Sequence, residues 1–237
     1  QECDPHRGIR QSPINIKTND AIPLVLPPLQ WSTGYGTMPE SMMLASDGHS
    51  LKLTVESSMP LNLKAPLTSV PYEFNHIHFH WGDGEDNNKG SEHYVNGHFY
   101  PLEMHAVHTQ SVSNTTDKFL VVAYLFQLSR QKNPVMEKIV DAILDATING
   151  NGTVENFKLI NLLYNIPFSY FTYEGSLTTP PYTESVVFLV AATHFPITKH
   201  QLEAFQQAAS INPGLRNNYR CLQDTNHRKV MHVLLPS

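Results

Sequence analysis

The segment that most constrains the fold is residues 73–81, EFNHIHFHW, where histidines alternate with β-branched and aromatic residues. Successive side chains of a β-strand point to opposite faces of its sheet, so we expect His76, His78 and His80 on one face of one strand. A second alternating run, residues 102–108, follows and includes His105. Such a histidine face indicates a metal site. The alternative is an ordinary polar sheet face or a row of buried, hydrogen-bonded histidines.

Strand geometry limits which of these histidines can share one ion. Residues i and i+2 of a strand lie roughly 6.5–7 Å apart and residues i and i+4 about 13 Å apart, whereas a zinc–nitrogen bond is only about 2.0–2.1 Å long. The ligand pair is therefore either His76 with His78 or His78 with His80. The third ligand must come from elsewhere, and His105 is the best candidate because it shares a strand face with Glu103.

The composition excludes several classes of protein. With 237 residues, of which 41% are hydrophobic and 16% charged, the chain can bury a sizeable core and is not disordered. A net charge of −5 provides no basic surface for nucleic acid. The longest apolar runs are far shorter than the ~20 residues that span a bilayer, so we expect no membrane span. No linker or repeat divides the chain, which predicts a single domain over residues 1–237.

Short strands separated by Pro, Gly and Asn account for most of the sequence. The clearest are residues 50–55, 74–81, 100–108, 119–128 and 186–192. One helix is predicted after Asn133 and Pro134, an N-cap and first-turn pair, and a second starts with a capping box from Thr198 to Gln201. We therefore expect a mainly β (α+β) fold around a large twisted, mostly antiparallel sheet, with a few short surface helices that have structural roles.

Several features favour a secreted protein. Cys3 and Cys221 lie near opposite ends of the chain, and we expect them to form a disulfide; two unpaired thiols are the alternative. Asn114 and Asn151 begin triplets with the form of N-glycosylation acceptors, although about two such triplets are expected by chance. The first residues lack the basic start and apolar centre of a signal peptide, as in a mature chain whose signal has been removed.

The candidate ligands have neighbours that suit a catalytic metal. A zinc ion with three neutral imidazoles keeps its double positive charge, which lowers the pKa of a bound water to about 7. Each imidazole also needs a hydrogen-bond partner that fixes its tautomer, and Glu103 and His76 each lie two residues from a candidate ligand on the same strand face. Val107 and Val121 are apolar side chains that could enclose a small dry pocket for a nonpolar substrate.

A series of motifs, in order and across essentially the whole chain, resembles the α-class carbonic anhydrases. The motifs are residues 11–16 (QSPINI), 78–82 (HFHWG), 90–93 (GSEH), 103–108 (EMHAVH), 173–181 (YEGSLTTPP) and 218–220 (NYR). A lone H-x-H would be a weak signal, whereas this series is highly specific. The resemblance implies a fold around a large twisted sheet, with Zn²⁺ at the foot of a conical cleft.

The resemblance also implies roles for individual residues. His78, His80 and His105 match the zinc ligands. Thr178 matches the threonine that accepts a hydrogen bond from the zinc-bound hydroxide and donates its own proton to Glu92. Together these bonds would aim the hydroxide at the substrate carbon.

Further matched positions surround this centre. Those that match the apolar pocket for CO₂ are Val107, Val121, Leu177 and Trp81. Thr179 matches the residue that lines the bicarbonate side, and Asn218 matches a main-chain acceptor for a ligand histidine. His49 matches the histidine that carries protons to bulk solvent, a role that suits a pKa near 6.5. The alternative for His49 is an exposed histidine in a turn.

The chain departs from the family pattern at several positions. His76 stands where a glutamine usually supports the first zinc ligand, Lys52 replaces a small polar residue, and Phe188 replaces a tryptophan beside the pocket. Tyr182 occupies the place of a cysteine that secreted members often use, so Cys3 would have to reach Cys221 instead. The usual N-terminal aromatic segment is also missing. We expect these departures to affect zinc affinity, the pKa of His49 and proton transfer, but not the chemistry.

The leading interpretation is a zinc lyase that interconverts CO₂ and bicarbonate, with some esterase activity, and that sulfonamides and small anions inhibit. One alternative is a non-catalytic carbonic-anhydrase-like protein used for binding, storage or a mineral matrix. Such relatives typically lose a zinc histidine, whereas this chain keeps all three. Another is a zinc hydrolase with a different substrate, against which the TTPP motif at residues 178–181 and the small apolar pocket argue.

Overall fold

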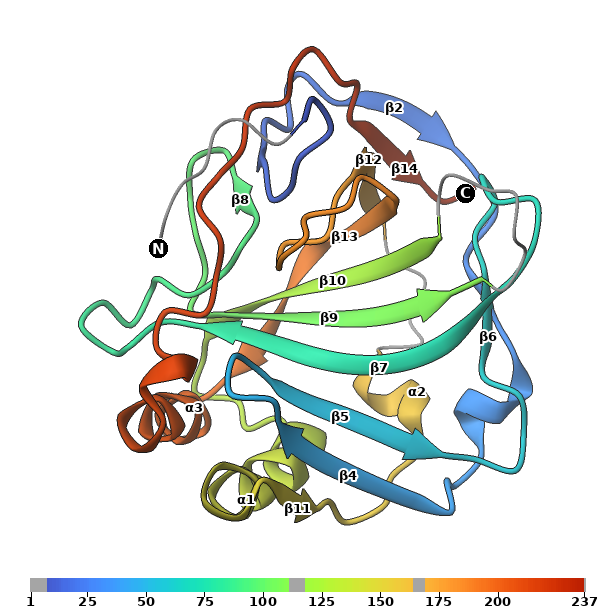
Figure 1. The fold of residues 1–237 in the computed structure, drawn as a ribbon. Helices are drawn as coiled ribbons and strands as arrows, with labels where there is room; N and C mark the ends of the chain where they lie inside the picture. Colours follow the sequence, from blue (N-terminus) through green and yellow to red (C-terminus); the bar gives the residue numbers. More distant parts are fainter. Residues whose placement is uncertain (1–7, 111–117, 164–168, 237) are drawn as a thin grey trace.

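The computed structural model describes residues 8–110, 118–163 and 169–236 (Figure 1). The strands are β1 (Asn15–Ile16), β2 (Ile22–Val25), β3 (Gln30–Trp31), β4 (Ser41–Ser46), β5 (Leu51–Glu56), β6 (Asn62–Lys64), β7 (Tyr72–Trp81), β8 (Tyr94–Val95), β9 (Leu102–Thr109), β10 (Phe119–Leu128), β11 (Asn151–Thr153), β12 (Tyr170–Gly175), β13 (Val186–Ile197) and β14 (Met231–Leu234). The helices are α1 (Pro134–Asn149), α2 (Leu159–Leu162) and α3 (Lys199–Ile211), with 3₁₀ turns η1 (Thr33–Gly36) and η2 (Pro213–Leu215).

One large twisted sheet runs through the molecule in the order β11-β4-β5-β7-β9-β10-β13-β12-β14-β2, with β3 and β6 joined at the side of β7 (Figure 1). Most neighbouring strands are antiparallel, whereas β10–β13 and β14–β2 are parallel. A separate parallel pair joins β1 to β8. The predicted mainly β fold with a mostly antiparallel sheet is therefore confirmed.

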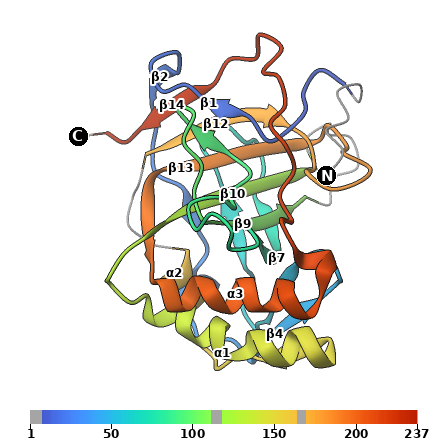
Figure 2. The ribbon, with the colours of Figure 1, turned by 90° about the vertical axis from the view of Figure 1, so that its left-hand side faces the viewer.

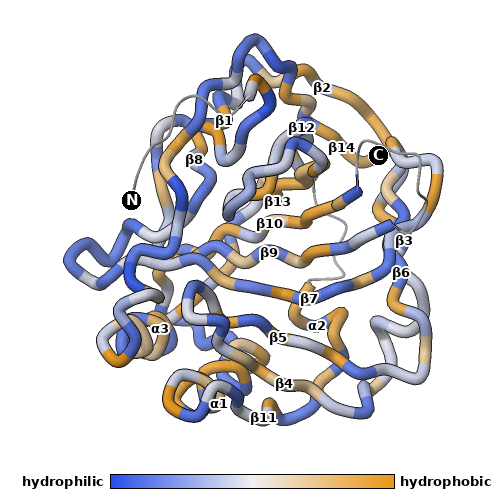
Figure 3. The backbone as a smooth tube through the Cα atoms, viewed as in Figure 1, coloured by the Kyte–Doolittle hydropathy of each residue, from blue (hydrophilic) through white to orange (hydrophobic). Residues whose placement is uncertain are grey.

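Alternation along the central strands separates two apolar clusters, one on each face of the sheet. Hydrophobic residues are prominent along β10 and β13 (Figure 3). The larger cluster takes the even-numbered residues of β10, such as Val122 and Tyr124, and packs against the helices. The smaller takes the odd-numbered residues Val121, Ala123 and Leu125. Histidines of β7 alternate with residues of the larger cluster, so they lie on the face that also carries the smaller cluster.

Both predicted helices form where their caps indicated, and they lie side by side below the sheet (Figure 2). The side chain of Asn133 accepts hydrogen bonds from the first turn of α1, and Thr198 and Gln201 form the capping box of α3. Apolar residues of both helices belong to the larger cluster. None of the helices in the described part of the chain has the length and apolar character needed to cross a bilayer.

The strand register determines which side chains meet on the histidine face. Across β7 and β9, His78 pairs with His105 and His80 with Glu103. Across β9 and β10, Val107 pairs with Val121. Side chains that are directly opposite in an antiparallel pair lie close together, so the register places the histidines beside an apolar patch.

Candidate metal centre

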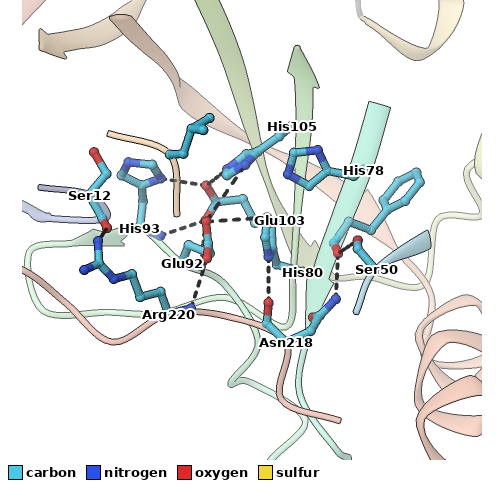
Figure 4. Close-up of polar contacts among 12 residues, drawn as sticks. Ser12, Ser50, His78, His80, Glu92, His93, Glu103, His105, Asn218 and Arg220 are labelled. Carbon is cyan, nitrogen blue, oxygen red and sulfur yellow. Dashed lines mark hydrogen bonds and ion pairs between the residues drawn. The ribbon is translucent and has the colours of Figure 1, made fainter. Parts of the chain in front are cut away.

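Three histidines converge at the centre of the sheet, two from β7 and one from β9 (Figure 4). One ring nitrogen each from His78, His80 and His105 lies within 4.8 Å of the others. Their ring centroids are 4.7–5.1 Å apart. Of the two ligand pairs that strand spacing allowed, the structure therefore brings His78 and His80 together with His105, and leaves His76 outside the group.

The orientation of His105 is set by Glu103, which is fully buried. Nε2–H of His105 donates to Oε1 of Glu103 at 2.6 Å, so Nδ1 faces the other two histidines. A carboxylate behind a ligand histidine fixes the tautomer and makes the ring a stronger ligand.

His80 is held by the main chain of Asn218. Nδ1–H of His80 donates to the carbonyl oxygen of Asn218 at 2.8 Å. The other nitrogen, Nε2, is buried and has no hydrogen-bond partner among the described residues. A buried ring nitrogen is normally satisfied, so this lone pair is the observation that best fits a metal ligand.

The third ring, His78, contacts its neighbour on the same strand face. Nδ1 of His78 lies 3.0 Å from Nε2 of His76. Nδ1 of His76 in turn lies 2.6 Å from Oδ1 of Asn75. His78 thus uses Nδ1 within the protein, as His80 does, and its Nε2 is left for an ion.

Behind Glu103 lies a buried polar network that connects distant parts of the chain (Figure 4). Oε1 of Glu103 also accepts from Nδ1–H of His93 at 2.6 Å, and Oε2 accepts from the main-chain N–H groups of Glu92 and His93. The hydroxyl of Tyr173 lies 2.6 Å from Nε2 of His93 and 2.9 Å from Oγ of Ser12. Sequence reasoning missed His93 and Tyr173 as supporting residues, although both lie within the motifs that carried the resemblance.

Glu92 is buried at the same centre. Its Oε1 accepts from the main-chain N–H of Arg220 at 3.0 Å. Its Oε2 lies 3.4 Å from Nε2 of His80 and 3.9 Å from Nδ1 of His105, and no described residue forms a hydrogen bond with it. The predicted bond from Thr178 to Glu92 is therefore not present in the described part of the chain. Thr178 itself is half-buried after β12.

The turn that carries His49 is tied to the strand of the metal ligands. Oδ1 of Asp47 accepts from the main-chain N–H groups of His49 and Ser50 at 2.9 and 2.7 Å. The side chain of Asn218 donates to the carbonyl oxygen of His49. Lys52 pairs with Oδ2 of Asp47 at 2.7 Å. His49 is exposed, as a residue that exchanges protons with solvent must be.

The apolar patch beside the histidines is smaller than predicted. Val107 and Val121 are buried on the histidine face, and Leu177 packs against the same cluster. Trp81 belongs to the cluster on the opposite face, where it packs against Phe205 of α3, so its predicted place in the pocket is wrong. The physical reason is the alternation of β7, which turns Trp81 away from His80.

Two further predicted positions flank this patch. Thr179 is exposed beyond β12. Phe188 is buried, stacks on Tyr173 with ring centroids 5.4 Å apart, and meets the ring of His105 edge-on at 5.6 Å. Phe188 therefore places an aromatic ring against His105 at the position where the family has a tryptophan.

Burial dominates the protonation of the histidines. It lowers the pKa of His80 and, with the neighbouring imidazoles, lowers that of His78 well below its ordinary value. Burial, followed by the charge of Lys52, lowers the pKa of His76 to about 4. Burial opposes the protonated form of His105 too, but Glu103 outweighs it and raises the pKa. Neutral rings are the form that binds a metal, so the two β7 ligands suit one at neutral pH.

The predicted sites of processing are tested only in part. Cys3 and Asn114 lie outside the described residues, so the disulfide with Cys221 and glycosylation at Asn114 stay predictions. Asn151 is exposed at the start of β11. Exposure is a requirement for an acceptor asparagine, but it does not show that a glycan is attached.

The donor set fits zinc. Three imidazole nitrogens are a catalytic zinc set that leaves a fourth position open. Each of the rings has its other nitrogen engaged by the protein. This pattern of outer hydrogen bonds is the one that metal-bound histidines show.

Comparisons with known proteins agree with this geometry. A family described as eukaryotic-type carbonic anhydrase matches residues 1–234. Carbonic anhydrase 7 of Homo sapiens is 34% identical over 241 residues, covering 94% of this chain and 88% of that protein. Carbonic anhydrase 6 of Bos taurus is 31% identical over 236 residues, covering 94% and 72%. Carbonic anhydrase 1 of Oryctolagus cuniculus is 32% identical over 216 residues, covering 87% and 89%.

Proposed function

This chain belongs to the family of eukaryotic-type carbonic anhydrases, and from that premise we propose that it is a zinc enzyme that interconverts CO₂ and bicarbonate. The observation that carries the proposal is the convergence of three ring nitrogens from His78, His80 and His105, each ring with its second nitrogen bonded to the protein. When bound there, Zn²⁺ supplies a Lewis acid that makes water a nucleophile at neutral pH.

The chain's own residues would position the reactants. Val107, Val121 and Leu177 form an apolar wall that excludes water and holds uncharged CO₂. Oε2 of Glu92 lies beside the ligand nitrogens of His80 and His105, and it would accept a hydrogen bond from the hydroxyl of Thr178. Thr178 would then orient the nucleophile by accepting a hydrogen bond from it.

Turnover also requires that a proton leave the site after each hydration step. His49 is the candidate carrier, because its ring is exposed and its turn is anchored to β7 through Asn218 and Ser50. The ring would take the proton on one nitrogen and release it to buffer from the other.

Stopped-flow CO₂ hydration on zinc-quantified protein tests this proposal. We expect turnover that scales with zinc content, disappears after zinc removal, returns on zinc addition and is blocked by an aromatic sulfonamide. His80→Ala is the matched negative control, prepared and zinc-treated in parallel. Ester hydrolysis that exceeds CO₂ hydration in the same preparation would instead identify a zinc hydrolase with another substrate.

One observation favours the non-catalytic alternative, a carbonic-anhydrase-like binding or storage protein. Within the described residues, Oε2 of Glu92 lacks the partner that orientation of the nucleophile requires. A zinc-replete protein without CO₂ turnover would support this alternative and reject the enzyme. We also propose that the protein is secreted, and recovery of the protein from the medium of cells that express its complete coding sequence would test this.

A further inference from the structure

The support for His78 differs from that of the other two ligands because it is itself an imidazole. A carboxylate or a carbonyl oxygen can only accept, so Glu103 and Asn218 leave their histidines one possible tautomer. A neutral imidazole donates at one nitrogen and accepts at the other. The ring of His76 can therefore meet His78 in two ways, and only one of them suits a metal.

The chemistry of the pair decides which way is productive. If His76 carries its proton on Nε2, it donates to Nδ1 of His78, and the proton of His78 must then sit on Nε2, where an ion would bind. If His76 carries its proton on Nδ1, its Nε2 accepts from Nδ1–H of His78 across the observed 3.0 Å. The Nε2 lone pair of His78 is then available. A selector for the second tautomer is needed.

Asn75 has the right atom in the right place. In the amide orientation that the structure gives, Oδ1 of Asn75 lies 2.6 Å from Nδ1 of His76 and can only accept, which selects the proton on Nδ1; the reversed amide would present N–H groups and select the other tautomer. Consecutive residues of a regular strand point to opposite faces, so this contact needs an irregular backbone. The register supplies one: Phe74 pairs with His108 and His76 with Val107, which leaves Asn75 as the extra residue of a β-bulge. Bulges commonly re-aim a side chain beside a functional site.

We propose that Asn75 is a positioning residue for the metal centre, whose side-chain oxygen keeps the proton of His76 on Nδ1 so that His78 presents Nε2 to the ion. Two hydrogen bonds act in series: Nδ1–H of His76 donates to Oδ1 of Asn75, and Nδ1–H of His78 donates to Nε2 of His76. No covalent bond is made or broken. This inference rests on the zinc site of the proposed function. It adds that the site extends outward to an exposed residue at the bulge.

A double-mutant comparison of zinc release tests the proposal without CO₂ turnover. Four proteins are loaded with Zn²⁺ and mixed with excess chelator: wild type, Asn75→Leu, His76→Gln and the double variant. Glutamine at position 76 can accept from His78 through its own carbonyl oxygen and needs no selector. Partners of ligand histidines typically contribute about 10- to 100-fold in metal affinity, and Asn75 is one step further from the ion. We therefore expect Asn75→Leu to release Zn²⁺ about 3- to 10-fold faster than wild type when His76 is present. In the His76→Gln background, Asn75→Leu should change nothing.

Several results would overturn the proposal. An equal effect of Asn75→Leu in both backgrounds would mean that Asn75 only stabilises the bulge, and no effect with His76 present would mean that it selects nothing. Asn62→Leu is the matched control, because Asn62 lies on the neighbouring strand β6 and bonds Ser32 through its main chain. That variant should release zinc at the wild-type rate.

A second measurement locates the proton directly. In zinc-loaded protein, ¹⁵N–¹H correlations of the imidazoles should show the hydrogen of His76 on Nδ1 and an unprotonated Nε2; the opposite tautomer rejects the proposal. Zinc release and NMR are independent of activity. A wild type that holds zinc but hydrates no CO₂ would contradict the proposed function alone, whereas a wild type that binds no zinc would overturn both.

Discussion

The two sides of the histidine cluster are supported in different ways. On the inner side, His80 and His105 are each 1% exposed, and Glu103 behind His105 is completely buried. On the outer side, His78 and His76 are half-buried and Asn75 is exposed. On the inner side, His80 is anchored by Asn218, which is 138 positions away, and Glu103 connects His105 to His93. The contacts on the outer side all lie within residues 75–78 of β7.

This difference indicates how freely each side can change. Glu103 accepts from four N–H groups, so its replacement leaves several buried donors unsatisfied and affects folding as well as the metal. At the outer side a changed side chain meets solvent, which replaces lost hydrogen bonds. We therefore expect inner substitutions to alter stability and metal affinity together, and outer substitutions to alter metal affinity alone.

The largest expected effect is loss of an inner ligand. His80→Ala removes a ligand nitrogen and should abolish zinc retention during dialysis against chelator. We expect zinc affinity to fall by more than the roughly 100-fold that follows loss of a group hydrogen-bonded to a ligand histidine. His76→Ala, the outer comparison, should weaken retention but not abolish it. Zinc content by mass spectrometry or atomic absorption distinguishes the two. Equal losses would mean that the ligand pair on β7 was wrongly assigned.

A histidine without a metal role provides a reference for burial itself. His108 lies on the other face of β9, with Nδ1 donating to the carbonyl oxygen of Ala106 and Nε2 accepting from Tyr35. Burial lowers its pKa from 6.5 to about 4. The unfolded chain therefore binds a proton between pH 6.5 and 4 that the folded chain does not, so the free energy of unfolding falls as the pH falls through this range, by about 3 kcal/mol.

Denaturant unfolding at several pH values measures this effect. His108→Gln keeps a donor and an acceptor but does not titrate, so its stability should depend less steeply on pH between 6.5 and 4. The same slope in both proteins would show that His108 does not contribute.

Glu103→Gln tests the prediction that the inner side couples folding to metal binding. The amide of the introduced glutamine would turn its own N–H groups toward N–H groups that now donate to the carboxylate. We therefore expect zinc affinity to fall about 10- to 100-fold. We also expect the free energy of unfolding to fall by about 1–3 kcal/mol, even in zinc-free protein. Chelator competition and denaturant titration measure the two effects. Lower affinity with unchanged stability would remove the distinction between the sides.

We expect the smallest effect from replacement of the exposed His49, which would affect turnover rather than zinc binding. His49→Ala should lower maximal CO₂ hydration in weak buffer with zinc content unchanged, because proton transfer by a positioned side chain is lost. We expect a loss of roughly tenfold, less than the roughly 10²- to 10⁴-fold typical of a positioned acid or base, because water and buffer still carry protons. Added imidazole should restore the rate. Failure of imidazole to restore it would exclude His49 as the proton carrier.

Much of this arrangement could be predicted from local patterns. Alternation in β7 and β9 predicted the shared face of His78, His80 and His105, and the caps predicted α1 and α3. The bulge at Asn75 could not be predicted, because it depends on the register between β7 and β9 rather than on β7 alone. Trp81 shows the opposite case. We predicted Trp81 in the pocket from the resemblance, although its position next to His80 in an alternating strand indicates the opposite face.

The contact between His80 and Asn218 has a consequence for how the protein is made. The two residues are 138 positions apart. During synthesis, β7 leaves the ribosome long before Asn218. Asn218 supplies the acceptor for His80, and its side chain forms hydrogen bonds with the main chain of β7 and with the carbonyl oxygen of His49. A nascent chain interrupted between His105 and Asn218 has all three histidines but lacks the groups that orient His80. Assembly of the candidate metal site in its native geometry is therefore a late event, which depends on completion of the chain rather than on the emergence of the three histidines.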